Sequence, residues 1–103
     1  MAKNTVGKRV IYKKRGKELR GTVEDEVSLL EKYPEEDFLD LIQYIRWDDG
    51  HHGIRFCYYV REHGSSDKDW IFANRPLSIG LDALEKLFRK ALEKRWFRDL
   101  LKP

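Results

Sequence analysis

One stretch, residues 53–61, constrains the fold of this chain more than any other. Its side chains read as a β-strand, in which successive residues point to opposite faces of a sheet. One face would carry Ile54, Phe56, Tyr58 and Val60, and we expect it to form part of the core. The other face would carry Arg55, Cys57, Tyr59 and Arg61. Cations beside aromatic rings are what a surface for phosphates and bases requires.

The rest of the chain predicts four more strands and one helix. Strand patterns cover residues 5–13, 18–27, 41–48 and 70–73, and Gly16 and Gly50 mark turns between them. From about residue 80 to about 96, apolar residues recur with a helical period. We therefore expect one α+β domain over residues 1–103, β-rich over 5–75, with a bent antiparallel sheet of five strands and a C-terminal helix.

Two segments within this pattern are less regular. In the second strand, Leu19, Gly21, Val23 and Val27 would face inward, and Gly21 suggests a bulge or a sharp bend. Residues 28–40 are acidic but also contain leucines and aromatic residues. We predict that they form a long connection with a short helical piece over 28–32 that stops before Pro34. This connection would pack over one end of the sheet or contact a partner.

The first quarter of the chain resembles the opening of SH3-like small barrels. The matching residues are Val6 to Tyr12, then Gly16, then Arg20-Gly21-Thr22-Val23. KOW, Tudor-like and CarD-type domains begin in this way, with a Gly-x-x-Val strand, a basic glycine turn and a Gly-x-Val strand. The resemblance implies a strongly bent SH3-like sheet or barrel. It also implies a binding module for nucleic acid, for methylated or proline-rich peptides, or for the transcription machinery.

Charge is arranged in blocks, with basic residues 1–20 and 86–102 on either side of acidic residues 24–40. We predict a nucleic-acid site, for RNA or DNA, on a basic turn and on one basic and aromatic face of the sheet. Its residues would be Arg9, Lys13, Lys14, Arg15, Lys17, Tyr44, Arg46, Arg55, Tyr59 and Arg61. The plainer interpretation is that these charges are solvated surface groups and that the acidic block covers or neutralises them.

The alternative function is a protein-interaction module or a small subunit of a larger assembly. It rests on the acidic connection over residues 28–40 and on an aromatic, apolar tail after the helix. The tail residues that would contact a partner are Trp96, Phe97 and Leu100.

Catalytic and metal chemistry have little support in the sequence. The cluster of Asp48, Asp49, His51 and His52 is more simply interpreted as a turn with exposed histidines. His63 could join it as a metal ligand only if the two loops met in space. Cys57 has no evident base beside it and suits a buried structural thiol. We therefore expect no enzyme activity and no cofactor. The single cysteine and the lack of a long apolar run lead us to expect a cytoplasmic protein outside the membrane.

Overall fold

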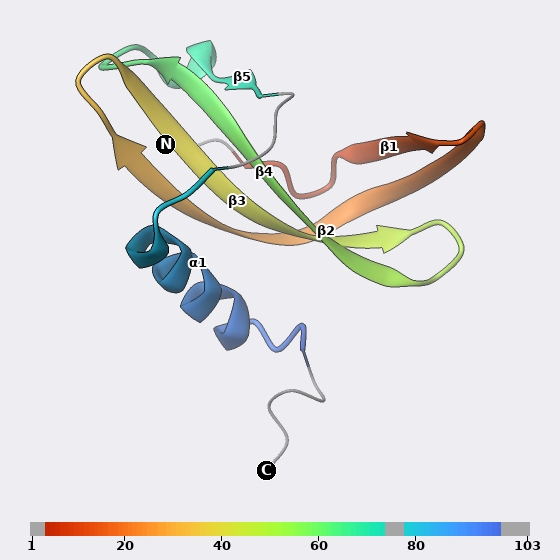
Figure 1. Ribbon diagram of the computed structural model, residues 1–103. Helices are drawn as coiled ribbons and strands as arrows, with labels where there is room; N and C mark the ends of the chain where they lie inside the picture. Colours follow the sequence, from red (N-terminus) through yellow and green to blue (C-terminus); the bar gives the residue numbers. More distant parts are fainter. Residues whose placement is uncertain (1–3, 74–77, 98–103) are drawn as a thin grey trace.

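The computed structural model describes residues 4–73 and 78–97, and of Lys14 only the backbone. Within these residues, five antiparallel strands lie side by side in chain order: β1 (Arg9–Lys14), β2 (Lys17–Lys32), β3 (Glu36–Trp47), β4 (His52–Glu62) and β5 (Ile71–Phe72). A 3₁₀ turn (Asp67–Asp69) precedes β5, and the helix α1 (Leu81–Glu93) follows it. The sheet curls into a half-barrel with α1 beneath it (Figure 1). The expected α+β class with a bent five-stranded sheet is confirmed.

Side chains are buried on both faces of this sheet. On the helix face, Val27 and Ile42 pack against α1 through Leu87 and Ala91. The opposite side, inside the curl, is the inner face, and it carries two apolar clusters. One cluster consists of Leu39, Leu41, Cys57, Tyr59 and Trp70; the other consists of Val10, Val23 and Ile45, with Trp47 packed against it.

The burial of β4 is the reverse of the expectation. Cys57 and Tyr59 are 5% and 8% exposed, whereas Ile54 and Phe56 are 38% and 42% exposed. The alternation correctly grouped the residues of each face, but it could not tell which face would be covered more fully. The inner face is enclosed by the curl of the sheet, while α1 packs over β2 and β3 and leaves the helix face of β4 half open. The middle strand of the sheet is β3.

Residues 28–40 form a hairpin, so the predicted long connection with a helical piece is wrong. β2 runs on to Lys32, β3 begins at Glu36, and Lys32 lies opposite Asp37. The turn closes with a hydrogen bond from the Tyr33 N–H to the Glu36 carbonyl, 2.9 Å. Pro34 needs no ladder partner there, because it lies in the turn itself.

A β-bulge between Val23 and Asp25 divides β2 into two halves. Before the bulge, Val23 faces inward beside Ile45; after it, Val27 lies on the helix face against α1. The predicted common face for Leu19, Gly21, Val23 and Val27 is therefore wrong, and Leu19 is exposed. The irregularity suggested by Gly21 exists, but it lies further along the strand.

Gly21 has a different role, since it lets Trp47 pack directly onto the backbone of β2. A Cβ atom at this position would lie 2.8 Å from Cε3 of Trp47 and 2.9 Å from the carbonyl oxygen of Arg46. We expect Gly21→Ala to destabilise the protein by about 1–3 kcal/mol, because the rigid indole and backbone would have to shift. Urea denaturation measures this loss. Gly80→Ala is the matched control, because no atom lies within 4 Å of its Cβ position; an equal loss in both variants would contradict the steric explanation.

Candidate nucleic-acid interface

The sheet divides the predicted basic and aromatic residues between its two faces. Arg9 and Arg46 both lie opposite Thr22 in the strand register, and they share the helix face with Tyr44. Arg55 lies opposite Gln43 and shares the inner face with Tyr59 and Arg61. A single surface containing all these residues, as the sequence suggested, does not exist.

The inner-face residues of this set are used inside the fold. Tyr59 is part of the buried cluster with Trp70. The Arg61 guanidinium pairs with Asp37 at 3.0 Å and Asp67 at 2.7 Å, and it lies 4.2 Å from the centroid of the Trp70 ring. Tyr59 and Arg61 therefore present neither an open ring nor a free cation to a nucleic acid.

On the helix face, Tyr44 has both sides of its ring covered. Its centroid lies 4.8 Å from that of His52 and 5.3 Å from that of Trp96, and both neighbours are nearly parallel to it. A base has no free face of Tyr44 on which to stack. Neighbouring Arg46 is also occupied, because its Nε lies 2.7 Å from a carboxylate oxygen of Glu24.

Arg9 forms a bidentate pair with Asp48 at the start of β1. Its two terminal nitrogens donate to the two carboxylate oxygens at 2.9 and 2.7 Å. The hydrogen bonds from Arg9, together with its positive charge, hold the pKa of Asp48 below its usual range. Arg9 thus joins β1 to the turn between β3 and β4, and its charge is locally balanced.

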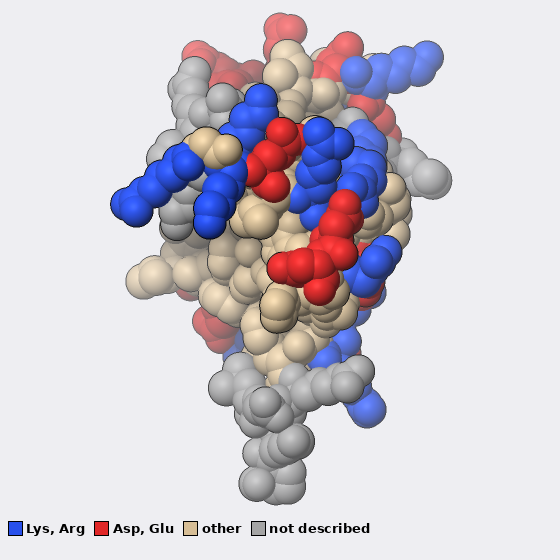
Figure 2. Space-filling view, turned by 90° about the vertical axis from the view of Figure 1, so that its right-hand side faces the viewer, with Lys and Arg blue, Asp and Glu red and all other residues tan. Residues whose placement is uncertain are grey.

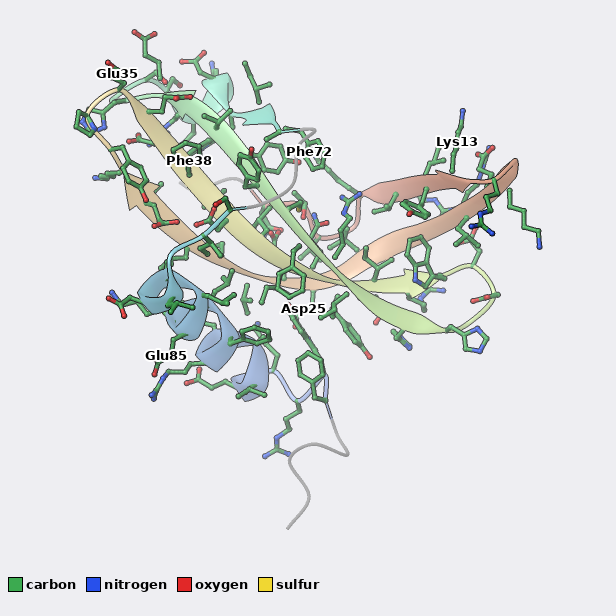
Figure 3. All side chains as sticks on the ribbon, in the orientation of Figure 1. Lys13, Asp25, Glu35, Phe38, Phe72 and Glu85 are labelled. Atoms are coloured by element: carbon green, nitrogen blue, oxygen red, sulfur yellow. The ribbon has the colours of Figure 1, made fainter. Side chains whose placement is uncertain are left out.

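The basic turn is the part of the predicted site that remains open. β1 and β2 form a hairpin that projects from the body of the protein (Figure 1), and we call residues 9–20 the ribbon. Arg15 and Gly16 form its tip with positive φ angles of 48° and 75°. Lys13, Arg15 and Lys17 are exposed and form no ion pair with any described residue. Lys13 points away from the ribbon (Figure 3).

The end-on view shows the charge at this end of the molecule (Figure 2). Lysine and arginine side chains gather there, with a few acidic ones between them. Within the ribbon the acidic residue Glu18 lies 2.6 Å from Arg20, so those two charges balance each other. The unpaired Lys13, Arg15 and Lys17 therefore give the ribbon its net positive charge.

Tyr12 is a ribbon residue that the sequence did not single out. Its ring is 51% exposed, and it lies opposite Leu19, which is also exposed. Alternation places Tyr12 on the same face as the buried Val10, which favoured a core position. The ribbon extends beyond the reach of the core at this point, and the neighbouring run of basic residues was the signal that could have revealed it.

The predicted protein-contact residues of the tail lie against the protein's own sheet. Trp96 stacks on Tyr44 and donates from Nε1 to Asp25 at 3.2 Å. Phe97 packs against the cluster of Val27 and Ile42. Leu100 lies outside the described residues.

The candidate metal ligands are placed separately. His51 pairs with Asp49, His52 lies beside Glu24, and His63 bonds to Asp37 at the other end of β4. Among residues 4–73 and 78–97, no three His, Cys, Asp or Glu side chains are grouped so that they could hold a metal ion. Burial raises the pKa of the Cys57 thiol to about 11, so this thiol is not an activated nucleophile.

The fold and the ribbon define a small α+β protein with a curled five-stranded meander and a projecting cationic hairpin. No protein-family model matches the chain, and comparisons with curated proteins and with solved structures gave no match either. In the described part of the chain, no helix has the length and apolar character needed to cross a membrane.

Proposed function

We propose that this protein binds nucleic acid through the ribbon. The observation that carries the proposal is the exposed, unpaired positive charge of Lys13, Arg15 and Lys17 on a projecting two-stranded hairpin. Lysine and arginine groups of this kind neutralise phosphates and release counterions, which drives association. The Tyr12 ring adds an exposed aromatic contact beside them.

The shape of the ribbon favours a duplex over a single strand. A single-strand site needs several open rings on which successive bases stack. Tyr59 is buried and Tyr44 is covered on both sides, which leaves Tyr12 as the ring within this site. The major groove of B-DNA, about 12 Å wide, accepts a two-stranded β-ribbon. We therefore favour double-stranded DNA as the ligand.

The likeness of the opening residues to SH3-like small barrels supports the same class of function. We include membership of that fold class in the proposal. The glycine turn at Gly16, which is part of the resemblance, forms the tip of the ribbon. KOW and CarD-type relatives would make the transcription machinery or its nucleic acid a natural context for binding.

The test is fluorescence-anisotropy binding to a short duplex and to a single strand of the same sequence, each titrated with salt. We expect the double variant Lys13→Glu with Lys17→Glu to weaken duplex binding at least tenfold. The slope of log affinity against log salt should fall by about two, because each lysine that contacts a phosphate contributes about one. The wild-type protein should prefer the duplex.

Lys68→Glu with Lys86→Glu is the matched control, since it changes the net charge equally at exposed sites away from the ribbon. This control should lose less than threefold in affinity. Equal weakening by the two double variants would show that net charge, and not the ribbon, determines binding. A stronger affinity for the single strand would overturn the groove model.

One observation favours protein–protein interaction as the second candidate function. Phe56 of β4 and Phe88 of α1 are both partly exposed, and their ring centroids are 5.9 Å apart. With Ile54 they form an apolar strip beside the helix, a kind of surface that partners often cover. If no oligonucleotide binds even at low salt, this strip becomes the better candidate for the binding surface of the protein.

A further inference from the structure

Two arginines on the inner face are part-buried, and only one of them has its charge balanced. Arg61 has two carboxylates, from Asp37 and Asp67, within ion-pair distance. Arg55 lies on the same strand and face, yet no carboxylate of the described residues forms an ion pair with it. The other described arginines, Arg9, Arg15, Arg20, Arg46, Arg89 and Arg95, are exposed.

The groups that do surround Arg55 are neutral. Its Nε donates to the Gln43 side-chain oxygen at 2.8 Å, and its guanidinium carbon lies 5.4 Å from the centroid of the Phe72 ring. It also reaches the thiol of Cys57. Burial raises the pKa of that thiol to about 11, so the thiol carries no negative charge at neutral pH.

Buried hydrogen bonds through Gln43 hold Arg55 in position. Gln43 is 1% exposed, and its amide nitrogen donates to the Thr5 hydroxyl at 2.7 Å. Thr5 is also buried and donates to one carboxylate oxygen of Glu26. A polar row thus crosses the inner face from β2 to β4, between its two apolar clusters. It consists of Glu26, Gln43 and Arg55. The Glu26 charge acts on Cys57 and Tyr59, as that of Arg55 does, but the Glu26 carboxylate forms no ion pair with Arg55.

The Arg55 guanidinium is partly removed from water, and its direct contacts are with neutral groups. Burying a charge in this way costs free energy, and an anion bound beside it would offset that cost. The planar guanidinium donates in pairs to carboxylate and phosphate groups. One aromatic wall, Phe72, is itself partly exposed at the β5 edge. Arg55 itself is only half-buried, so part of its side chain remains open to a small anion in solvent.

We propose that Arg55 anchors a binding site for a small oxyanion, the carboxylate or phosphate group of a metabolite-sized ligand, between Gln43 and Phe72 at the β5 edge. Gln43 sets the orientation of the guanidinium, and Phe72 covers one side of it. This site lies on the inner face of the sheet and is separate from the ribbon. Anion binding at Arg55 can therefore be tested independently of nucleic-acid binding.

The test follows the Nε–Hε resonance of Arg55 in the full-length ¹⁵N-labelled protein. The probes are inorganic phosphate and acetate, added at constant ionic strength against sodium chloride. We expect a saturable shift with at least one probe, with a midpoint on the order of 1 mM or lower. Saturation by phosphate alone identifies a phosphate site, saturation by acetate alone identifies a carboxylate site, and both together identify a general oxyanion site.

Arg55→Lys keeps the charge but loses the paired donors, so it should weaken binding at least tenfold, as followed by the amide resonance of Cys57. Arg95→Lys, at an exposed position after α1, should leave the titration unchanged. The proposal is overturned if both anions give only the drift seen with chloride, or if the Arg95 resonance responds as strongly as that of Arg55. The variant Lys13→Glu with Lys17→Glu should still bind the anion, which separates this site from the ribbon.

Discussion

Replacing Asp37 by alanine should lower the melting temperature of the protein by at least about 10 °C. Asp37 is 1% exposed, and it accepts hydrogen bonds from Arg61 at 3.0 Å and His63 at 2.7 Å. Removing the carboxylate would leave Arg61, whose side chain is 12% exposed, without its buried partner. The His63 side chain would also lose its bond to β3, and Arg61 would keep only its ion pair with Asp67.

Differential scanning fluorimetry with the tryptophan signal measures this change. Glu36→Ala is the control, because Glu36 is the neighbouring residue on β3 and is exposed; its melting temperature should change by no more than about 2 °C. A similar fall in both variants would mean that the end of β3, and not the buried ion pair, is the sensitive element.

Asp37 also predicts an acid dependence. Burial alone would raise the pKa of this carboxyl, but hydrogen bonds from His63, Arg61 and the Gly64 N–H outweigh burial and lower it. The stabilisation from Asp37 is therefore present above the pKa of an unfolded chain, about 3.9, and is lost as the pH falls through the lower folded value. Asp37→Ala should lack this acid-dependent component.

Asp40 should give the opposite pH dependence, with stability falling as the pH rises from about 4 to about 8. Asp40 is 2% exposed on the helix face, and its Oδ2 atom has no hydrogen-bond partner among the described residues. Burial, a hydrogen bond with Glu31 and the Glu31 charge raise the pKa of Asp40 to about 8. In this pH range the unfolded chain releases the proton while the folded protein retains it, so rising pH favours unfolding.

Asp40→Asn removes this titration while keeping the shape of the side chain. We expect the variant to be more stable than the wild type at pH 8 by several kcal/mol, with an upper limit of about 5 kcal/mol, and to differ little at pH 4. Urea denaturation at pH values between 4 and 8.5 measures the difference. Asp82→Asn, on the exposed first turn of α1, should keep the wild-type profile. A wild-type stability that does not fall between pH 4 and pH 8 would show that Asp40 ionises normally in the fold.

Local patterns in the sequence predicted the class of the fold, and they failed where both faces of the sheet are used. The period of α1, the turn at Gly16 and the strand character of residues 53–61 are all confirmed. Residues 28–40 were assigned to a connection because acidic residues and Pro34 are typical of loops. In the fold the acidic residues Glu31 and Asp40 lie within β2 and β3, and only the turn itself contains Pro34.

The candidate site was predictable only where it depends on local sequence. The basic turn is a contiguous run, so its exposure followed from a hairpin assignment. The placement of Arg61 and Tyr44 depended on partners far along the chain, Asp37 for Arg61 and Trp96 for Tyr44. A strand pattern shows which residues share a face, but it does not contain the tertiary contacts that cover that face.

The bulge in β2 decides where this strand can change its length. Deleting Glu24, the residue without a register partner between Val23 and Asp25, would leave Val23 opposite Ile45 and Asp25 opposite Tyr44. Val27 would stay against α1, and Glu26 would keep its contact with Thr5. A deletion within residues 26–32 would instead move the side chains on one side of it to the opposite face of the sheet. The strand can therefore lose a residue at its bulge, whereas other changes of length belong in turns such as the one at Gly50.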